Sequence, residues 1–133
     1  ILDRAEWCAR EDMKLILQPV TKAEILRYWL VNNDFVIKSE AQVEENGTVY
    51  QIICAAPGRD CRYMDAELFI GRYELIKSSP YFDRLLSKHI KRFALAVEGL
   101  KTTNREELLP WLGLVENILS ELEMMLEWKN ENR

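Results

Sequence analysis

The sequence predicts an α/β fold over its first half, followed by an antiparallel pair of helices. Three observations carry this prediction: a strand–helix–strand order over residues 14–43, an Asn46-Gly47 turn between two strand-like runs, and two long helical patterns after residue 79. The chain has 133 residues, of which 48% are apolar and 30% charged, so it is long enough for about one domain with a buried core. No apolar run approaches the ~18 residues that a membrane-spanning helix needs.

The first third of the chain is predicted to form a helix, a strand and a second helix. Residues 1–10 carry apolar side chains at helical spacing. The apolar run at residues 14–18, closed by Pro19, is typical of a buried strand. Thr21 and Glu24 then have the spacing of a capping box, which opens a helix that we expect to end at Asn32-Asn33.

A β-hairpin is predicted next. One face of the first strand is formed by alternate residues, namely Phe35, Ile37, Ser39, Ala41 and Val43. Asn46-Gly47 favours a tight type I′ turn, in which both central residues need a positive φ, and residues 48–56 form the return strand. A strand–helix–strand unit gives parallel strands and the hairpin reverses the last one. We therefore expect a mostly parallel sheet with one reversed strand near its edge. Three strands and one or two helices cannot cover both faces of such a sheet, so a partner is expected.

The second half is predicted to be a helical hairpin. Ser79-Pro80 is typical of a helix start, and the apolar stripe that follows comprises Phe82, Leu86, Ile90, Phe93, Val97 and Leu100. A second stripe has heptad spacing and comprises Leu108, Leu112, Val115, Leu119, Leu122 and Leu126. Pro110 predicts a kink or a late start of that helix. The stripe with heptad spacing could pack against the preceding helix of the same chain, which we favour, or against a second chain.

These patterns divide the chain into three parts. Residues 1–58 form the α/β part, residues 59–79 a connector in which 65–70 could be helical, and residues 80–133 the helical hairpin. We expect no internal repeat and no low-complexity segment within them.

Charge separates the two predicted helices, although the whole chain has a net charge of −4. Residues 77–103 carry six basic and two acidic side chains, whereas residues 104–133 carry three basic and seven acidic ones. The basic helix could contact RNA phosphates, with Arg84, Lys88, Lys91 and Arg92 as candidates. The alternative is a solvated face that attracts the acidic helix.

Several other kinds of site are disfavoured. The five glycines stand at least ten residues apart, so no glycine-rich phosphate loop exists. Three cysteines and a single histidine do not suggest a metal site, and the cysteine count suits a reducing cytoplasm. Cys61 stands beside cations that could lower the pKa of its thiol, but no histidine or second thiol is placed to assist. His89 lies beside the apolar stripe, where a packing role is favoured over catalysis.

Gln18 and Pro19 are the candidates for an active-site wall. They follow a predicted parallel strand, and open α/β sheets place their ligands at the carboxyl ends of such strands. The alternative is that Gln18-Pro19 only directs the chain out of the strand.

Taken together, these segments resemble the carboxy-terminal part of the bacterial tRNA (adenine-22-N1)-methyltransferase family. The matching stretches are Leu15-Ile16-Leu17-Gln18-Pro19, Arg27-Tyr28-Trp29-Leu30, residues 43–53, Ile70-Gly71, Leu75-Ile76 and Ser79-Pro80-Tyr81-Phe82. Two positions depart from the family pattern: Val20 stands where the family has asparagine, and Arg72 where it has proline. The first departure weakens a family-like role for the end of this strand.

The resemblance implies the last three strands of a class I, Rossmann-like methyltransferase sheet, with one antiparallel strand, and a coiled-coil-like helical appendix. It implies an S-adenosylmethionine-dependent parent enzyme that methylates tRNA in the bacterial cytoplasm. The family's cofactor loop precedes the part matched here, so we expect this chain alone to bind no cofactor and to be inactive. The start at Ile1 rather than at methionine agrees with a fragment. Its partners would be tRNA and either the missing amino-terminal part or a second copy pairing at residues 14–18. A non-catalytic helical dimerisation or adaptor module is the alternative.

Overall fold

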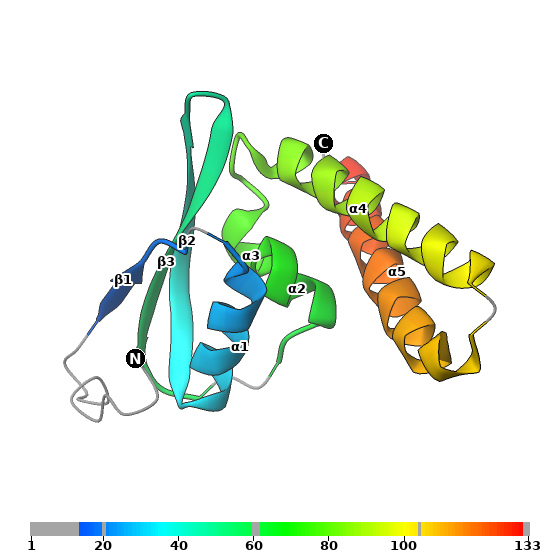
Figure 1. Ribbon diagram of the computed structural model, residues 1–133. Helices are drawn as coiled ribbons and strands as arrows, with labels where there is room; N and C mark the ends of the chain where they lie inside the picture. Colours follow the sequence, from blue (N-terminus) through cyan, green and yellow to red (C-terminus); the bar gives the residue numbers. More distant parts are fainter. Residues whose placement is uncertain (1–13, 20, 60–61, 104, 132–133) are drawn as a thin grey trace.

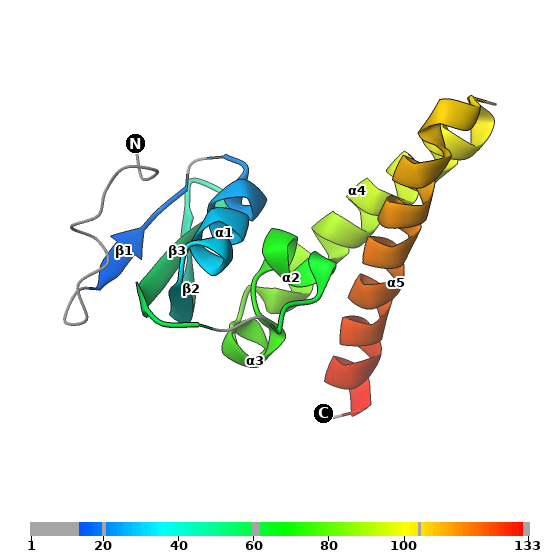
Figure 2. The same cartoon turned by 90° about the horizontal axis from the view of Figure 1, so that it is seen from below.

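The computed structural model describes residues 14–19, 21–59, 62–103 and 105–131 (Figure 1). The helix predicted over residues 1–10 lies outside the described residues. The elements, in order, are β1 (Leu15–Leu17), α1 (Ala23–Asn32), β2 (Phe35–Glu45), β3 (Thr48–Pro57), α2 (Asp65–Ile70), α3 (Tyr73–Ile76), α4 (Phe82–Thr102), a 3₁₀ turn (Glu106–Leu108) and α5 (Leu109–Glu131). The sheet and α1 lie at one end of the molecule, α4 and α5 at the other, and α2 and α3 between them (Figure 2).

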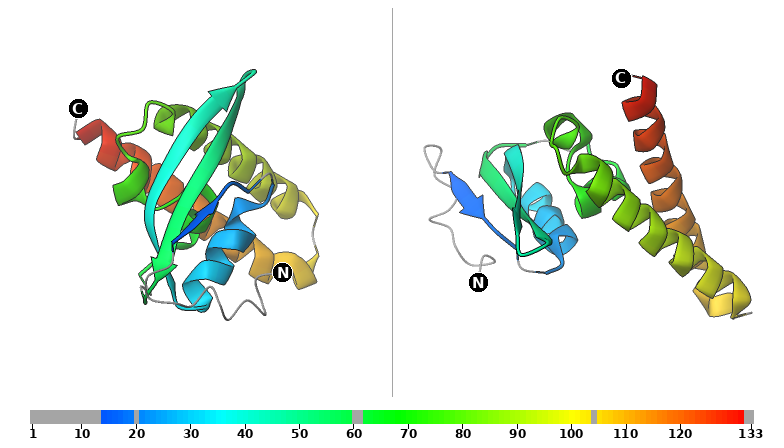
Figure 3. Two further views of the ribbon diagram at one scale, coloured as in Figure 1. Left: turned by 90° about the vertical axis from the view of Figure 1, so that its left-hand side faces the viewer. Right: turned by 90° about the horizontal axis from the view of Figure 1, so that it is seen from above.

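The sheet has the order β1-β3-β2, and both of its pairings are antiparallel. The expectation of a mostly parallel sheet is therefore wrong for the described residues. β1 and β2 do point the same way, but the return strand β3 fills the space between them instead of adding at an edge. The hairpin extends far beyond the short strand β1 (Figure 3).

β1 is less buried than its apolar sequence predicts. Leu15 and Leu17 pair with Ala55 and Ile53 and contribute to the core beneath α1. Ile16 faces the other way and is 75% exposed. The reason is that only one face of this part of the sheet is covered by described residues.

A β-bulge in β2 overturns the predicted alternation of its side chains. Phe35 and Ile37 are buried as expected, but the pairing register shifts between Ile37 and Ser39. The extra residue reverses the faces beyond it, because side chains alternate with a period of two. Val43 is consequently 42% exposed, whereas Glu40 turns toward the core.

The Asn46-Gly47 turn is confirmed. Both residues have a positive φ, 52° and 82°, and Glu45 pairs with Thr48 across the turn. The tip of the hairpin reaches α4, where Arg84 donates a hydrogen bond to the carbonyl oxygen of Gly47.

The capping box predicted at Thr21 and Glu24 is wrong. Helix α1 begins at Ala23, its N-cap is Lys22 with a left-handed φ of 54°, and no side chain caps it. Thr21 therefore lies one residue too early for its hydroxyl to reach the first turn. The predicted end of the helix at Asn32-Asn33 is confirmed.

The helical half is centred on a second core. Residues 65–70 form α2 as predicted, and α3 is a further short helix that was not predicted. The stripe of α4 is buried largely as expected, with Leu85 and His89 added to it. In α5 the buried residues are Ile118, Leu122 and Met125, and Leu126 of the predicted heptad is 39% exposed.

That difference arises because α5 is apolar on more than one face. Only the side that packs on α4 and α2 is covered, and Leu122 is fully buried there. The far end of α5 returns to the start of α4, where Lys129 Nζ lies 3.7 Å from Asp83 Oδ1. Pro110 is the second residue of α5, which accords with a late start. Within the described residues, no helix combines the length and the apolar character that crossing a membrane requires.

Candidate functional site

The candidate site is a pocket where the sheet half meets the helical half, and we call it the junction pocket. It has a volume of about 210 Å³. Its walls come from Pro19 after β1, the first turn of α1, the start of β3, and one face of α4. With Phe69 of α2, four elements distant in sequence therefore contribute to one hollow.

The pocket is basic. Lys22 from the start of α1 lines it, as do Lys88 and Arg92 from α4, and the lining contains one carboxylate, Glu24. Within the described part of the chain, none of the three cations has a carboxylate within 4.0 Å. Arg84, one turn before Lys88, differs because it lies 3.2 Å from Glu44.

Arg92 is held against an aromatic wall. Its guanidinium carbon lies 5.8 Å from the centre of the Phe69 ring and 5.4 Å from that of Phe93. Such a cation–π arrangement orients the guanidinium but leaves its N–H edge available to an acceptor, because the contact uses the face of the group.

His89 lies between Lys88 and Arg92 at the base of the same face and is 9% exposed. Burial lowers the pKa of its imidazole to about 4, with Arg92, Lys88 and Arg27 adding to the shift by charge repulsion. His89 is therefore neutral at pH 7, and its Nδ1 has no hydrogen-bond partner among the described residues. The predicted packing role fits this burial.

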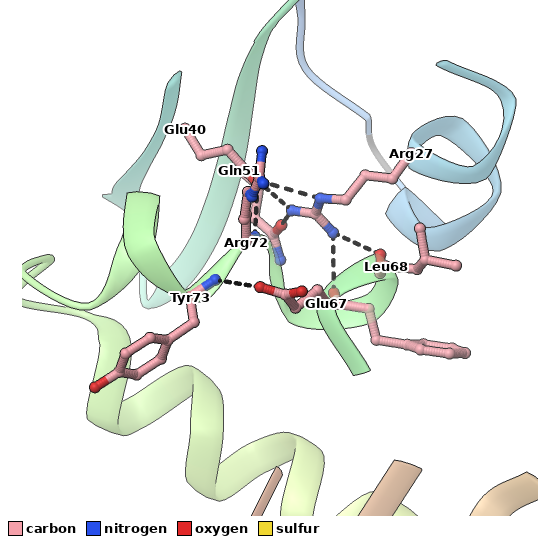
Figure 4. Close-up of polar contacts among 8 residues, drawn as sticks. Arg27, Glu40, Gln51, Glu67, Leu68, Arg72 and Tyr73 are labelled. Carbon is pink, nitrogen blue, oxygen red and sulfur yellow. Dashed lines mark hydrogen bonds and ion pairs between the residues drawn. The ribbon is translucent and has the colours of Figure 1, made fainter. Parts of the chain in front are cut away.

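A buried network of polar contacts lies beside the pocket, whose lining includes Gln51 (Figure 4). Arg27 of α1 and Glu40 of β2 form an ion pair of 2.6 Å between fully buried side chains. Arg27 also donates hydrogen bonds to Gln51 of β3 and to the carbonyl oxygens of Leu68 (2.8 Å) and Phe69 (3.1 Å). All five N–H donors of its guanidinium are thus used.

The network joins the sheet to the connector between the halves. Glu40 also accepts a hydrogen bond from the backbone N–H of Arg72, at 3.0 Å. Gly71, with a φ of 110°, lies so close that a Cβ there would be 2.9 Å from Glu40 Oε1. Since Gln51 and Phe69 both line the junction pocket, this network determines where its walls stand.

A second buried carboxylate orders the connector itself. Glu67 accepts hydrogen bonds from the backbone N–H groups of Met64 and Tyr73, both at 2.9 Å. The N–H of Ala66 is bound by Glu121 of α5 at 3.0 Å. The short helices α2 and α3 are therefore tied to each other and to α5 by carboxylates.

The predicted site residues are only partly brought together. Pro19, Lys88 and Arg92 line the junction pocket, whereas Gln18 is exposed beside it and does not line it. Lys91 is exposed on α4 outside the pocket, and Arg84 is held by the hairpin. Cys61 lies outside the described residues.

Sequence reasoning missed Lys22 and the network around Arg27. Nothing in the sequence sets Lys22 apart, since its position depends on the left-handed start of α1. The burial of Glu40 depends on the bulge, which has no clear sequence signal. The packing position of His89, in contrast, was predicted, because it stands four residues before Phe93 and three after Leu86, beside the apolar stripe.

Comparison with known proteins identifies the family of the chain. The sequence model of the tRNA (adenine(22)-N(1))-methyltransferase family, TrmK, matches residues 1–118. No curated protein sequence matches the chain.

Solved structures share the fold. The B. subtilis M1A22 tRNA methyltransferase TrmK superposes with a TM-score of 0.72 at 20% identity, over 86% of this chain and 52% of that one. Sp1610 of Streptococcus pneumoniae, a putative tRNA (m1A22) methyltransferase in complex with S-adenosyl-L-methionine, gives 0.55 at 26% identity, over 80% and 47%. M. capricolum TrmK in complex with S-adenosyl-homocysteine gives 0.63 at 17% identity, over 84% and 50%.

The chain spans about half the length of these structures. The family match, in contrast, extends over most of the chain and includes the strands, the connector and the basic helix α4. This chain therefore belongs to the tRNA (adenine(22)-N(1))-methyltransferase family.

Proposed function

We propose that this chain is the carboxy-terminal part of an S-adenosylmethionine-dependent tRNA (adenine-N1)-methyltransferase. It would contribute the edge of the catalytic sheet and the helices that contact tRNA. The observation that carries the proposal is the junction pocket, in which Pro19 at the end of β1 faces the cations of α4. A strand end that borders the active site and a basic RNA-binding face would then be neighbours.

The glycines of this chain do not form a loop that fits the cofactor. Gly47 lies in the hairpin turn, Gly58 directly follows β3, Gly71 ends α2, and Gly99 and Gly113 lie inside helices. A nucleotide-binding loop needs glycines that let several backbone N–H groups approach the ligand together. We infer that the cofactor is held by residues that precede this part of the family fold, and that the chain alone is inactive.

Within the whole enzyme, the methyl group would pass to N1 of adenine, which depends on holding the base in line with the donor. Gln18 and Pro19 would form one wall of the site. Lys88, Lys91 and Arg92 would hold the tRNA, while Arg84 would act mainly by fixing the hairpin to α4, because Glu44 and Gly47 already bind it.

The same proposal divides the chain into residues 1–58 of the methyltransferase domain, a connector at 59–79 and the helical, coiled-coil-like appendix at 80–133. The two separate hydrophobic cores, one under the sheet and one among α2–α5, support a boundary near residue 58, whereas α2 and α3 of the connector share the core of the appendix. The exposed side chain of Ile16 supports a further partner at β1, either the preceding part of the sheet or a second copy. tRNA methylation would place the protein in the cytoplasm.

Binding of tRNA by this chain tests the RNA role directly. We expect the affinity to fall steeply with salt, because each neutralised phosphate releases counterions. The triple variant Lys88→Glu, Lys91→Glu, Arg92→Glu should bind at least tenfold more weakly, by order of magnitude, with a shallower salt dependence. Lys101→Glu, at the far end of the same helix, is the matched control. Equal affinities of the triple variant and the unaltered chain would refute the role of α4.

Calorimetry tests the assignment of the cofactor. We expect no binding when S-adenosylmethionine is titrated into this chain. Stoichiometric binding would contradict the proposal that the cofactor is held elsewhere.

A helical dimerisation or adaptor module is the second candidate. It is favoured by apolar side chains that remain exposed on α5, among them Leu109 (59%), Trp111 (60%) and Leu114 (42%). Sedimentation of the Trp111→Glu variant beside the unaltered chain tests it. A dimer that this substitution dissociates would favour the module, whereas a monomer at all concentrations would reject it.

A further inference from the structure

The junction pocket has the size and charge of an anion site. Its volume of about 210 Å³ is below the roughly 300–1,000 Å³ typical of pockets for whole small molecules. Such a space suits a single polyatomic anion better than a nucleoside. Three cations against one carboxylate make an anion the favoured occupant.

The cations converge from both halves of the fold. Lys88 and Arg92 are one turn apart on α4, and Lys22, the N-cap of α1, lines the same pocket. Since no described carboxylate neutralises them, their charges are available to a ligand. Helix α1 adds the partial positive charge of an N-terminus that no side chain caps.

The polar lining fits the same ligand. Arg92 is oriented by the rings of Phe69 and Phe93, so that it can bind two oxygens of one phosphate with parallel hydrogen bonds. His89 also lines the pocket, and its buried Nδ1 has no hydrogen-bond partner among the described residues. Phosphate oxygens accept hydrogen bonds from the guanidinium of Arg92 and from the ammonium groups of Lys22 and Lys88.

We propose that the junction pocket binds one backbone phosphate of an RNA strand, held by Lys88 and Arg92 from the helical half and by Lys22 from the sheet half. This rests on the proposed function, and adds that a single phosphate bridges the two halves of the fold. The phosphate thereby sets the position of the strand relative to Pro19 and the end of β1. Contacts of α4 outside the pocket, such as Lys91, would be with other phosphates.

The three cations acting on one phosphate predict a specific pattern of affinities. Lys22→Gln, Lys88→Gln and Arg92→Gln should each weaken tRNA binding several-fold. The triple variant should lose less than the product of the single effects, because all three remove the same contact. The salt dependence of tRNA binding by this triple variant should correspond to about one phosphate contact fewer. Adding Lys91→Gln should multiply the loss of affinity by the factor that Lys91→Gln causes alone, because Lys91 contacts another phosphate. Lys101→Gln is the control for a charge lost elsewhere on α4.

Neutral linkages in the RNA locate the phosphate itself. A methylphosphonate placed at each linkage in turn should weaken binding strongly, about tenfold, at one linkage. The triple variant should be insensitive to that substitution and still sensitive at the others. Evenly spread interference that persists in the triple variant, or strictly multiplicative losses in the single variants, would overturn the proposal.

Inorganic phosphate separates this proposal from the proposed function. The charged and titratable groups around His89 are Lys22, Glu24, Arg27, Tyr50, Lys88 and Arg92. Phosphate in the pocket should raise the pKa of His89, measured by NMR against chloride at equal ionic strength. The shift should vanish in the triple variant.

The outcomes are distinct. A chain that binds tRNA but shows neither the linkage effect nor the phosphate shift retains its RNA role and lacks this site. A chain that binds no tRNA but shows the phosphate shift has an anion pocket that is not an RNA site, which overturns the proposal as stated. Loss of both refutes the site and the RNA role together.

Discussion

Arg27 and Glu40 form an ion pair in which both side chains are completely buried, between α1 and the bulged strand β2. The pair binds the backbone of α2 through Leu68 and Phe69, and that of the connector through Arg72. It forms a polar link between the sheet and the segment that leads to the helical half. Because both partners are desolvated, removing one leaves a buried charge, which costs far more than the pair itself contributes.

Glu40→Gln is therefore expected to lower the free energy of unfolding by about 3 kcal/mol, and Arg27→Met by about 3–5 kcal/mol. The double variant should cost clearly less than the sum, since neither charge is then left alone. Urea unfolding measures all three. The exposed Lys77–Glu74 pair is the control: Glu74 raises the pKa of Lys77, yet Glu74→Ala should leave the stability nearly unchanged, because solvent screens the pair. A double variant whose loss of stability equals the sum of the two single losses would show that Arg27 and Glu40 are not coupled.

Gly71 should tolerate no side chain. Its φ of 110° and the Glu40 carboxylate 2.9 Å from the position of a Cβ predict that Gly71→Ala destabilises the chain by about 2 kcal/mol or more. Gly113 in α5 is the matched control, because a Cβ there meets nothing within 4 Å. Gly113→Ala should stabilise by up to about 1 kcal/mol. Thermal unfolding of the two variants should therefore shift in opposite directions.

Stability should fall as the pH falls through the range in which His89 titrates in the unfolded chain. The native pKa of about 4 lies below the ordinary 6.5, so the unfolded state binds more protons between these values. The contribution of His89 is intact above pH 6.5 and is lost by about pH 4. Between pH 7 and pH 5 the loss should be about 2 kcal/mol.

His89→Leu removes the titrating group and so provides the comparison. Carboxylates also titrate over part of this range, and the difference between the two chains cancels their effect. Urea midpoints at pH 7 and pH 5 give the measurement. Equal pH dependence in both chains would mean that His89 is protonated without cost in the native state.

Thr21→Ala should have little effect, below about 0.5 kcal/mol, because Thr21 is not the N-cap of α1. A true capping residue would cost about 1 kcal/mol. Lys22→Gly should increase stability by several tenths of a kcal/mol, since the φ of 54° favours glycine. Melting temperatures of both variants, measured by calorimetry, distinguish a helix capped by Thr21 from one whose N-cap is Lys22.

The sequence predicted most of the elements but not the polar interior. The Asn46-Gly47 turn and the helix at 65–70 were correct because local backbone preferences determine them. The prediction of which face of α5 is buried was wrong in part. Apolar residues on more than one face of α5 have helical spacing, and tertiary packing determines which of them are buried. The order of the strands was wrong because pairing is decided by which neighbours are present.

The candidate site was predictable only along α4. Lys88, Lys91 and Arg92 stand out as a charged face against an apolar stripe, and two of them do line the junction pocket. Lys22 lies near them because its own backbone is left-handed, and Glu40 contacts Arg27 because the bulge in β2 turns its side chain inward. Neither feature leaves a pattern in a single sequence, since each depends on contacts between distant segments.

The extra residue at Lys38 has a consequence for how this protein can change. Substitutions in β2 act on one side chain at a time, whereas deleting Lys38 would exchange inside for outside over the whole distal arm of the hairpin. Glu40 and Gln42 would then face solvent, and Ala41 and Val43 would face the guanidinium of Arg27. Related chains should therefore accept many replacements at this position but keep the length of the strand unchanged.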